Sequence, residues 1–142
     1  MPDRLTHWSK KIQSALIDID DADRWLNSGK AINWVPDKIS AAIYWAMEGW
    51  LRQRGYEPDF GNGLRSMHLQ FRNLAPEKLH QEASSVLSGS TFLEFDLLGD
   101  PSELEVTTKE WSLDSWKSKA NDVLLKARTF INSVEKDLSA RV

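Results

Sequence analysis

The sequence contains no cysteine and no apolar run long enough to cross a membrane. Without cysteine, the chain has no disulfide, no thiolate nucleophile and no zinc site built on cysteine. The longest unbroken apolar run covers residues 41–47, whereas a membrane-spanning helix needs about 20 apolar residues. Charged residues interrupt the first positions, where a signal peptide has an apolar stretch. We therefore expect a cytoplasmic protein of a prokaryote, with no membrane partner.

Net charge and strand-like patterning are also nearly absent. Eighteen basic and 21 acidic residues leave a net charge of −3, so no overall field attracts nucleic acid. No stretch alternates apolar and polar residues with the period of a strand, and the chain has no internal repeat. With 142 residues, it is expected to form one all-α domain over residues 1–142, large enough to fold without a metal or a disulfide.

Common catalytic motifs are missing as well. The three histidines lie far apart in sequence, and no pair has the spacing of metal ligands. No glycine-rich loop leads into Lys-Ser or Lys-Thr, and no serine lies in a nucleophile elbow. We expect neither a metal nor a cofactor.

The sequence does have helical periodicity, most clearly at its centre in residues 37–58. Apolar residues cover most of the circumference there, which is typical of a helix buried among other helices. Asp37 is predicted to cap its start. Gly55 is predicted to end it in a left-handed conformation, with Tyr56 folding back on Leu51 and Pro58 preventing the helix from resuming.

Four further segments are predicted to be helical: residues 5–27, 63–71, 77–98 and 107–139. Asn62 is the predicted cap of the short second one, and Thr107 with Glu110 forms a capping box for the last. Ser88-Gly89-Ser90 predicts a kink or a short break in the third. Because short connections favour antiparallel neighbours, we expect an up-down four-helix bundle with one additional short helix.

Two groups of charged residues are candidate binding surfaces. Arg65, His68 and Arg72 share one side of the short helix, where they can bind a phosphate or a carboxylate. Four aspartates crowd one side of the first helix and can attract a cation: Asp18, Asp20, Asp21 and Asp23. For both groups the alternative is an ordinary solvated helix face.

Seven tryptophans are many for a chain of this length. Tryptophan buries a large area and is enriched at subunit interfaces. Trp34 and Trp111 lie at the starts of helices rather than inside an apolar stripe, so they are our interface candidates. The alternative is that all seven belong to the core.

Several segments share motifs with one family of helical domains. SAAIYWAMEGWLRQRGYEP (residues 40–58) is an alanine-rich, tyrosine-containing helix with a Gly-x-x-Pro exit, and NGLRSMHLQF (62–71) follows it. WLNSG (25–29) ends the first helix, and FLEFD occupies residues 92–96. In these motifs the chain resembles the HEPN superfamily, which includes partners of nucleotidyltransferases and RNase toxins in prokaryotes.

The resemblance implies an HEPN-like bundle that forms a homodimer, with a nucleotidyltransferase or another toxin–antitoxin or defence component as partner. RNase members carry an Arg followed four to six residues later by His, within the fourth helix. Residues 84–90, the corresponding region, contain neither, and Arg72 precedes His80 by eight positions with Pro76 between them. We therefore expect a non-catalytic homodimeric binding module that contacts a nucleotide or RNA through Arg65, His68 and Arg72.

Two alternatives stay open. In a divergent metal-independent RNase toxin, Arg72 and His80 would be the catalytic residues, provided that folding or dimer formation brings them together. In an oligomeric scaffold, the bundle would have no ligand at all.

Overall fold

The computed structural model describes residues 2–98 and 113–140, with the side chains of residues 10–94 and 114–140. The elements are α1 (Pro2–Ser28), the 3-10 helix η1 (Ile32–Trp34), α2 (Val35–Gln53), α3 (Leu64–Leu74), α4 (Glu77–Leu98) and α6 (Leu113–Ser139). These ranges contain no strand, which confirms the all-α class for this part of the chain. None of the helices in them is long and apolar enough to pass through a membrane.

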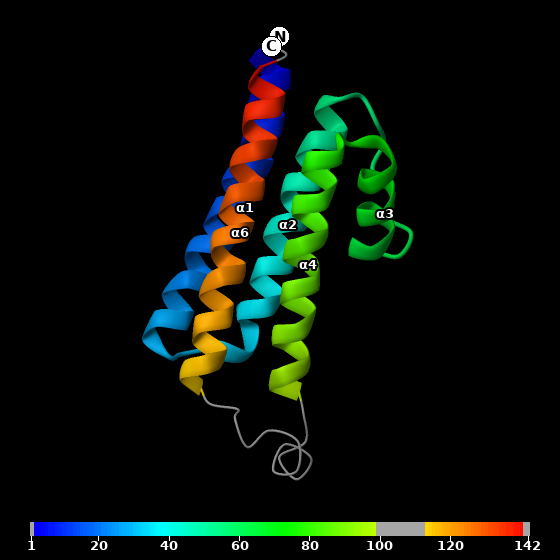
Figure 1. Cartoon of the computed structure of the whole chain (residues 1–142). Helices are drawn as coiled ribbons and strands as arrows, with labels where there is room; N and C mark the ends of the chain where they lie inside the picture. The colour runs from blue at the N-terminus through cyan, green and yellow to red at the C-terminus, as the bar shows by residue number, and fades with distance from the viewer. Residues whose placement is uncertain (1, 99–112, 141–142) are drawn as a thin grey trace.

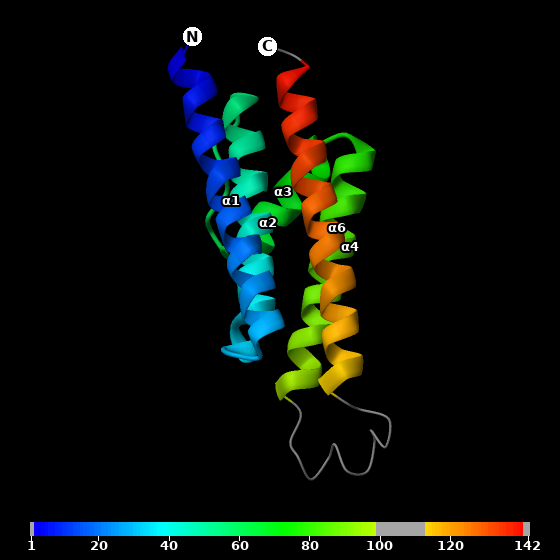
Figure 2. The same cartoon turned by 90° about the vertical axis from the view of Figure 1, so that its left-hand side faces the viewer.

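The four long helices lie side by side, and α3 lies outside α2 and α4 at one end of the molecule (Figures 1 and 2). Consecutive long helices run in opposite directions, and the two chain ends are near the same end of the molecule (Figure 1). Helix α2 contacts each of the other helices in the described ranges, as its apolar circumference predicts.

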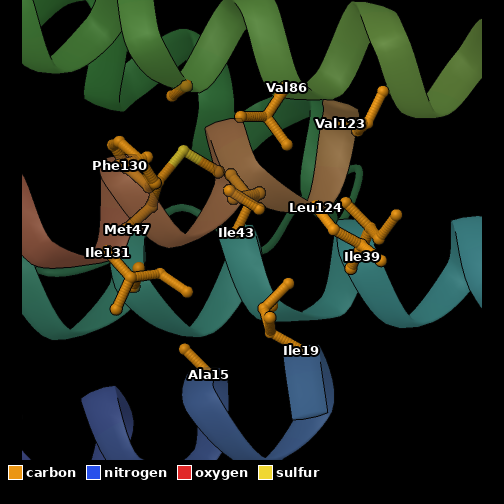
Figure 3. Packing of buried hydrophobic residues seen from close by; sticks show 14 of the residues in the cluster. Ala15, Ile19, Ile39, Ile43, Met47, Val86, Val123, Leu124, Phe130 and Ile131 are labelled. Atoms are coloured by element: carbon orange, nitrogen blue, oxygen red, sulfur yellow. The ribbon is translucent and has the colours of Figure 1, made fainter. Parts of the chain in front are cut away.

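The core forms where the apolar side of each helix meets α2 (Figure 3). Ile39, Ile43 and Met47 of α2 are completely buried between Ile19 of α1 and the apolar sides of α4 and α6. Full burial of a side chain of this size stabilises the fold by about 1.5–3 kcal/mol.

Phe71 attaches α3 to this core. Its ring lies edge-on to Trp50 of α2, with centroids 5.3 Å apart, and to Phe130 of α6, with centroids 5.8 Å apart. Phe71 and Met67 are both fully buried, although α3 lies on the outside of the long helices. These contacts fix which side of α3 faces away from the core.

The start of α2 differs from the prediction. The helix begins at Val35, so Asp37 lies in its first turn and is not the N-cap; Trp34 is the N-cap and offers no side-chain hydrogen bond. Pro36 explains the shift, because its fixed φ and missing N–H suit the first turn of a helix.

The end of α2 agrees with the prediction. Gly55 has a φ of 86°, and the Tyr56 N–H donates to the Leu51 carbonyl oxygen at 2.9 Å. With the Gly55 N–H donating to the Arg52 carbonyl at 3.0 Å, this is a Schellman ending. The Tyr56 ring stacks on Trp50, with centroids 6.3 Å apart.

The start of α3 is also corrected. Gly63, with a φ of 59°, is the N-cap, and it makes no side-chain cap bond. Asn62 does not cap the helix; its backbone N–H donates to Ser66 Oγ at 2.8 Å. The side chain that satisfies the free backbone group therefore comes from inside the helix rather than from before it.

Helix α4 runs without a break through Ser88-Gly89-Ser90, so the predicted interruption is wrong. Residues 91–98 belong to the same helix, as predicted. A Cβ on Gly89 would lie 2.7 Å from Val123 Cγ2 of α6. Ser90 is 1% exposed, and its hydroxyl donates to the Pro36 carbonyl oxygen at 2.9 Å. These small residues let α4 approach its neighbours closely.

The predicted capping box at Thr107 and Glu110 and the loop before it lie outside the described residues. The last helix is observed from Leu113 to Ser139, which agrees with its predicted end.

Replacing Gly89 with alanine tests the close approach of α4 to α6. In an exposed helix interior this change usually stabilises by about 1 kcal/mol. Here we expect a loss of about 1–3 kcal/mol in the free energy of unfolding, because Val123 is branched and has a stiff χ1. Urea denaturation measures the change.

Two further variants control the measurement. Ser88→Ala, on the exposed side of the same helix, should change the free energy of unfolding by no more than about 0.5 kcal/mol. Combined with Val123→Ala, Gly89→Ala should cost less than the sum of the two single changes. A Gly89→Ala variant as stable as the original chain would contradict the close approach.

Candidate functional site

Arg65, His68 and Arg72, the predicted binding surface on α3, do not share one environment. Arg65 and Arg72 are exposed, whereas His68 is half-buried and turned toward α4. His68 Nε2 lies 3.0 Å from Ser84 Oγ, at hydrogen-bond distance. His68 therefore belongs to a contact between two helices and not to a solvated helix face.

Helix α4 supplies a second pair of polar residues in matching register. His80 and Ser84 are four positions apart and share a side of α4, as His68 and Arg72 do on α3. Helix α3 runs opposite to α4 (Figure 1). Since His68 lies against Ser84, this direction places Arg72, one turn after His68, toward the turn of α4 that carries His80, one turn before Ser84. We call His68, Arg72, His80 and Ser84 the α3–α4 cluster.

The pKa of His68 shows the effect of these neighbours. Burial lowers the pKa of His68 below its usual value, and the positive charges of Arg72 and His80 lower it further. Charges act on the ring in this way only when they are near it. Folding therefore brings Arg72 and His80 to the same histidine, although they are eight positions apart in the sequence.

The cluster can hold an anion. Arg72 offers a planar set of N–H donors that suits a phosphate or a carboxylate. His68 is neutral at pH 7 because its pKa is lowered, so one ring nitrogen is free to take up a proton when an anion arrives. Arg65 lies two turns before Arg72 on α3 and extends the positive surface along the helix.

Sequence reasoning missed Ser84, and it treated Arg72 and His80 as separated by Pro76. The only available signal was the shared spacing, His68 with Arg72 and His80 with Ser84, on two helices joined by a tight turn. That signal becomes informative only when the two helices are known to lie against each other.

The aspartates of α1 are occupied by ion pairs with other helices. Lys38 Nζ of α2 lies 3.3 Å from Asp18 Oδ1, and Arg128 of α6 lies 2.9 Å from Asp20 Oδ1 and 3.6 Å from Asp23 Oδ2. In the described ranges, no group of three His, Asp or Glu residues has the arrangement of a metal site. The aspartates thus connect α1 to its neighbours.

Of the two interface candidates, Trp34 and Trp111, only Trp34 lies in the described residues. Trp34 ends η1 and is 61% exposed, so its ring is accessible to a partner. Trp111 lies outside the described residues. Trp50 and Trp116 are buried, and Trp25 and Trp45 are packed against the core, so much of the aromatic content is structural.

Comparisons with protein-family models, with curated proteins and with solved structures find no match for this chain.

The lowered pKa of His68 has a consequence for stability. The unfolded chain takes up the proton near pH 6.5, whereas the folded protein takes it up only at lower pH. Stability is therefore complete above pH 6.5 and falls as the pH drops from there toward the folded pKa. Between about pH 7.5 and 5.5, the free energy of unfolding should therefore fall less for His68→Gln than for the original chain, as measured by urea denaturation.

Arg72→Gln provides a graded comparison. It removes one of the two charges that lower the pKa of His68, so the pH dependence should shrink without disappearing. Identical pH profiles for the original chain and His68→Gln would show that His68 is not the responsible group.

Proposed function

We propose that this chain is a non-catalytic, HEPN-like up-down bundle that acts as a homodimeric binding module. Its ligand-facing surface is the α3–α4 cluster together with Arg65, and its ligand is a phosphate group of RNA or of a nucleotide. The observation that carries the proposal is the contact of His68 with Ser84 of α4 at 3.0 Å, with Arg72 and His80 near enough for their charges to lower the pKa of His68.

A phosphate is the ligand that best suits these groups. Arg72 can donate two parallel hydrogen bonds to phosphate oxygens, and the histidines add donors once they are protonated. An anion at this point would raise the pKa of His68 again, so binding should take up a proton. The net charge of −3 gives no long-range attraction, which makes a local site necessary.

The RNA-binding proposal is tested with a short single-stranded RNA. Arg72→Ala should weaken binding about tenfold or more, since it removes a charge-assisted contact. Lys126→Ala, an exposed lysine of α6, should leave the affinity unchanged. Affinity should also rise as the pH falls below 6.5 toward the lowered pKa of His68, where the histidine of the folded protein gains its proton. An affinity that does not change with Arg72→Ala would exclude the cluster as the RNA site.

The cluster also favours a second candidate, a metal-independent RNase. A neutral His68 can take the proton from a ribose 2′-hydroxyl, whose oxygen then attacks phosphorus. Protonated His80 can give its proton to the leaving 5′-oxygen as the P–O bond breaks, and Arg72 can stabilise the charge that develops on the phosphorane. The products would be a 2′,3′-cyclic phosphate and a free 5′-hydroxyl.

The two candidates differ in one assay. The non-catalytic module leaves RNA intact when metal is removed by a chelator. Cleavage under those conditions that disappears in both Arg72→Ala and His80→Ala would replace the first candidate with the second. Cleavage that persists in both variants would come from a contaminant and would leave the first candidate standing.

The homodimer and a nucleotidyltransferase or another toxin–antitoxin partner are the remaining parts of the proposal. They are supported by the motif resemblance and by the exposed Trp34, since tryptophan is enriched in interfaces.

Sedimentation velocity tests the dimer. We expect a dimer at tens of micromolar, and we expect Trp34→Ala to weaken association about tenfold or more, as truncation of a buried interface aromatic does. Replacement of Phe92, a residue with a similarly exposed ring on α4, should not change the association. A monomer at every concentration would remove the homodimer from the proposal.

A further inference from the structure

One side of α2 faces away from the core and carries aromatic and charged side chains. Trp34, the N-cap of α2, lies seven positions before Ala41, and Glu48 lies seven positions after it. Seven positions are almost two helical turns, so the three residues share this side. Part of the surface remains exposed for the following residues of the same side: Ala41, Tyr44, Trp45 and Arg52. We call the side that runs from Trp34 through Ala41 to Arg52 the outer face of α2.

The end of the outer face near Glu48 is positively charged. Glu48 Oε2 lies 3.1 Å from Lys11 Nζ of α1 and 2.8 Å from Arg52 Nε. Glu48 is 4% exposed, whereas the side chains of Lys11 and Arg52 are 24% and 30% exposed. The two cations therefore cover the carboxylate, and because one acid lies between two cations, a positive charge is left at the surface.

Aromatic rings surround these cations. Lys11 Nζ lies 4.6 Å from the centroid of the Trp45 ring, and Arg52 Cζ lies 5.8 Å from that of Phe60. Tyr44 connects the two rings, with its centroid 5.8 Å from that of Trp45 and 6.4 Å from that of Phe60. Tryptophan, tyrosine and arginine are the residue types that contribute most to protein–protein binding. This end of the face is therefore suited to contact with another protein surface.

The other end of the outer face is aromatic and negatively charged. Trp34 is 61% exposed there. Asp37, one turn later, is also exposed and makes no ion pair with another described residue. The neighbouring Lys38 is paired with Asp18 of α1 at 3.3 Å, so it does not neutralise Asp37. The two ends of the face thus have opposite charges.

We propose that the outer face of α2 binds the outer face of a second copy of this chain, with the two α2 helices antiparallel and Ala41 at the two-fold axis. In such a contact, residues at equal distances before and after the axis meet. The inference rests on the homodimer of the proposed function and names the face that forms it. The small Ala41 side chain lets the two helices approach closely.

The antiparallel arrangement brings complementary groups together. Trp34 of one copy meets the cations that cover Glu48 of the other, and a tryptophan ring attracts cations. Asp37 of one copy comes beside Trp45 of the other, where Lys11 lies over the ring. A parallel pair would put the two positive ends side by side, which is unfavourable.

The absence of cysteine from the chain makes this arrangement directly testable. Ala41→Cys places a thiol of each copy at the proposed axis. A disulfide needs two Cα atoms within about 7 Å, so only positions near the axis can form it readily. We expect mild oxidation at tens of micromolar to link most of the Ala41→Cys protein into a dimer. Leu125→Cys, at a 66% exposed position of α6, should form little.

Sedimentation velocity of matched charge variants gives a second measurement. Ala41→Arg should weaken association about tenfold or more, because it places two like charges at the axis. Leu125→Arg makes the same change of charge on α6 and should leave association unchanged. Asp37→Lys should also weaken association, and added salt should reduce the difference from the original chain.

Two results would overturn the inference, and they are distinguishable. A dimer that persists in Ala41→Arg, with Leu125→Cys linked as readily as Ala41→Cys, would leave the homodimer standing and place its interface elsewhere. A monomer at every concentration would remove both the homodimer and this inference, and would leave the outer face for a different protein. RNA binding by the α3–α4 cluster is measured separately and does not bear on either result.

Discussion

Burial of α2 on nearly all sides is the constraint on which the rest of the structure depends. Each of the other helices in the described ranges contacts α2, and Ile39, Ile43 and Met47 have no exposed surface. A polar group in such a place needs partners, because an unpaired buried charge is strongly unfavourable. Glu48 of α2 is 4% exposed, and its Oε2 lies 3.1 Å from Lys11 Nζ and 2.8 Å from Arg52 Nε. The one buried acid of the core helix is thus held between two cations.

The end of α2 determines where α3 lies. The Schellman ending at Gly55 turns the chain away from the axis of α2. Helix α3 then packs against α2, where the Phe71 ring contacts the Trp50 ring. With α3 held there, His68 reaches Ser84 and the α3–α4 cluster forms. The Trp50 indole N–H also donates to Asp137 of α6 at 2.8 Å.

The distribution of charge leaves cations for the proposed anion site, although the net charge of the chain is −3. Many of its acids are paired with cations of neighbouring helices, as Asp18 is with Lys38 and Asp20 with Arg128. Such partly exposed pairs contribute about 0–1 kcal/mol each, so they help to set which helices meet more than they stabilise the fold. Arg65 and Arg72 make no ion pair with another described residue, so any attraction of the α3–α4 cluster for an anion is local.

The sequence by itself determined the helices, because a helix is built from contacts three and four residues apart and its apolar side is visible in the spacing. It also determined the exit of α2 at Gly55, where the required conformation is local. Only the tertiary structure decided the role of Gly89, which predicted a break in α4 and instead provides the contact with Val123. The same holds for His68, whose partner Ser84 is sixteen positions away. Local spacing shows which side of a helix is apolar, but it contains no information on which other helix that side will meet.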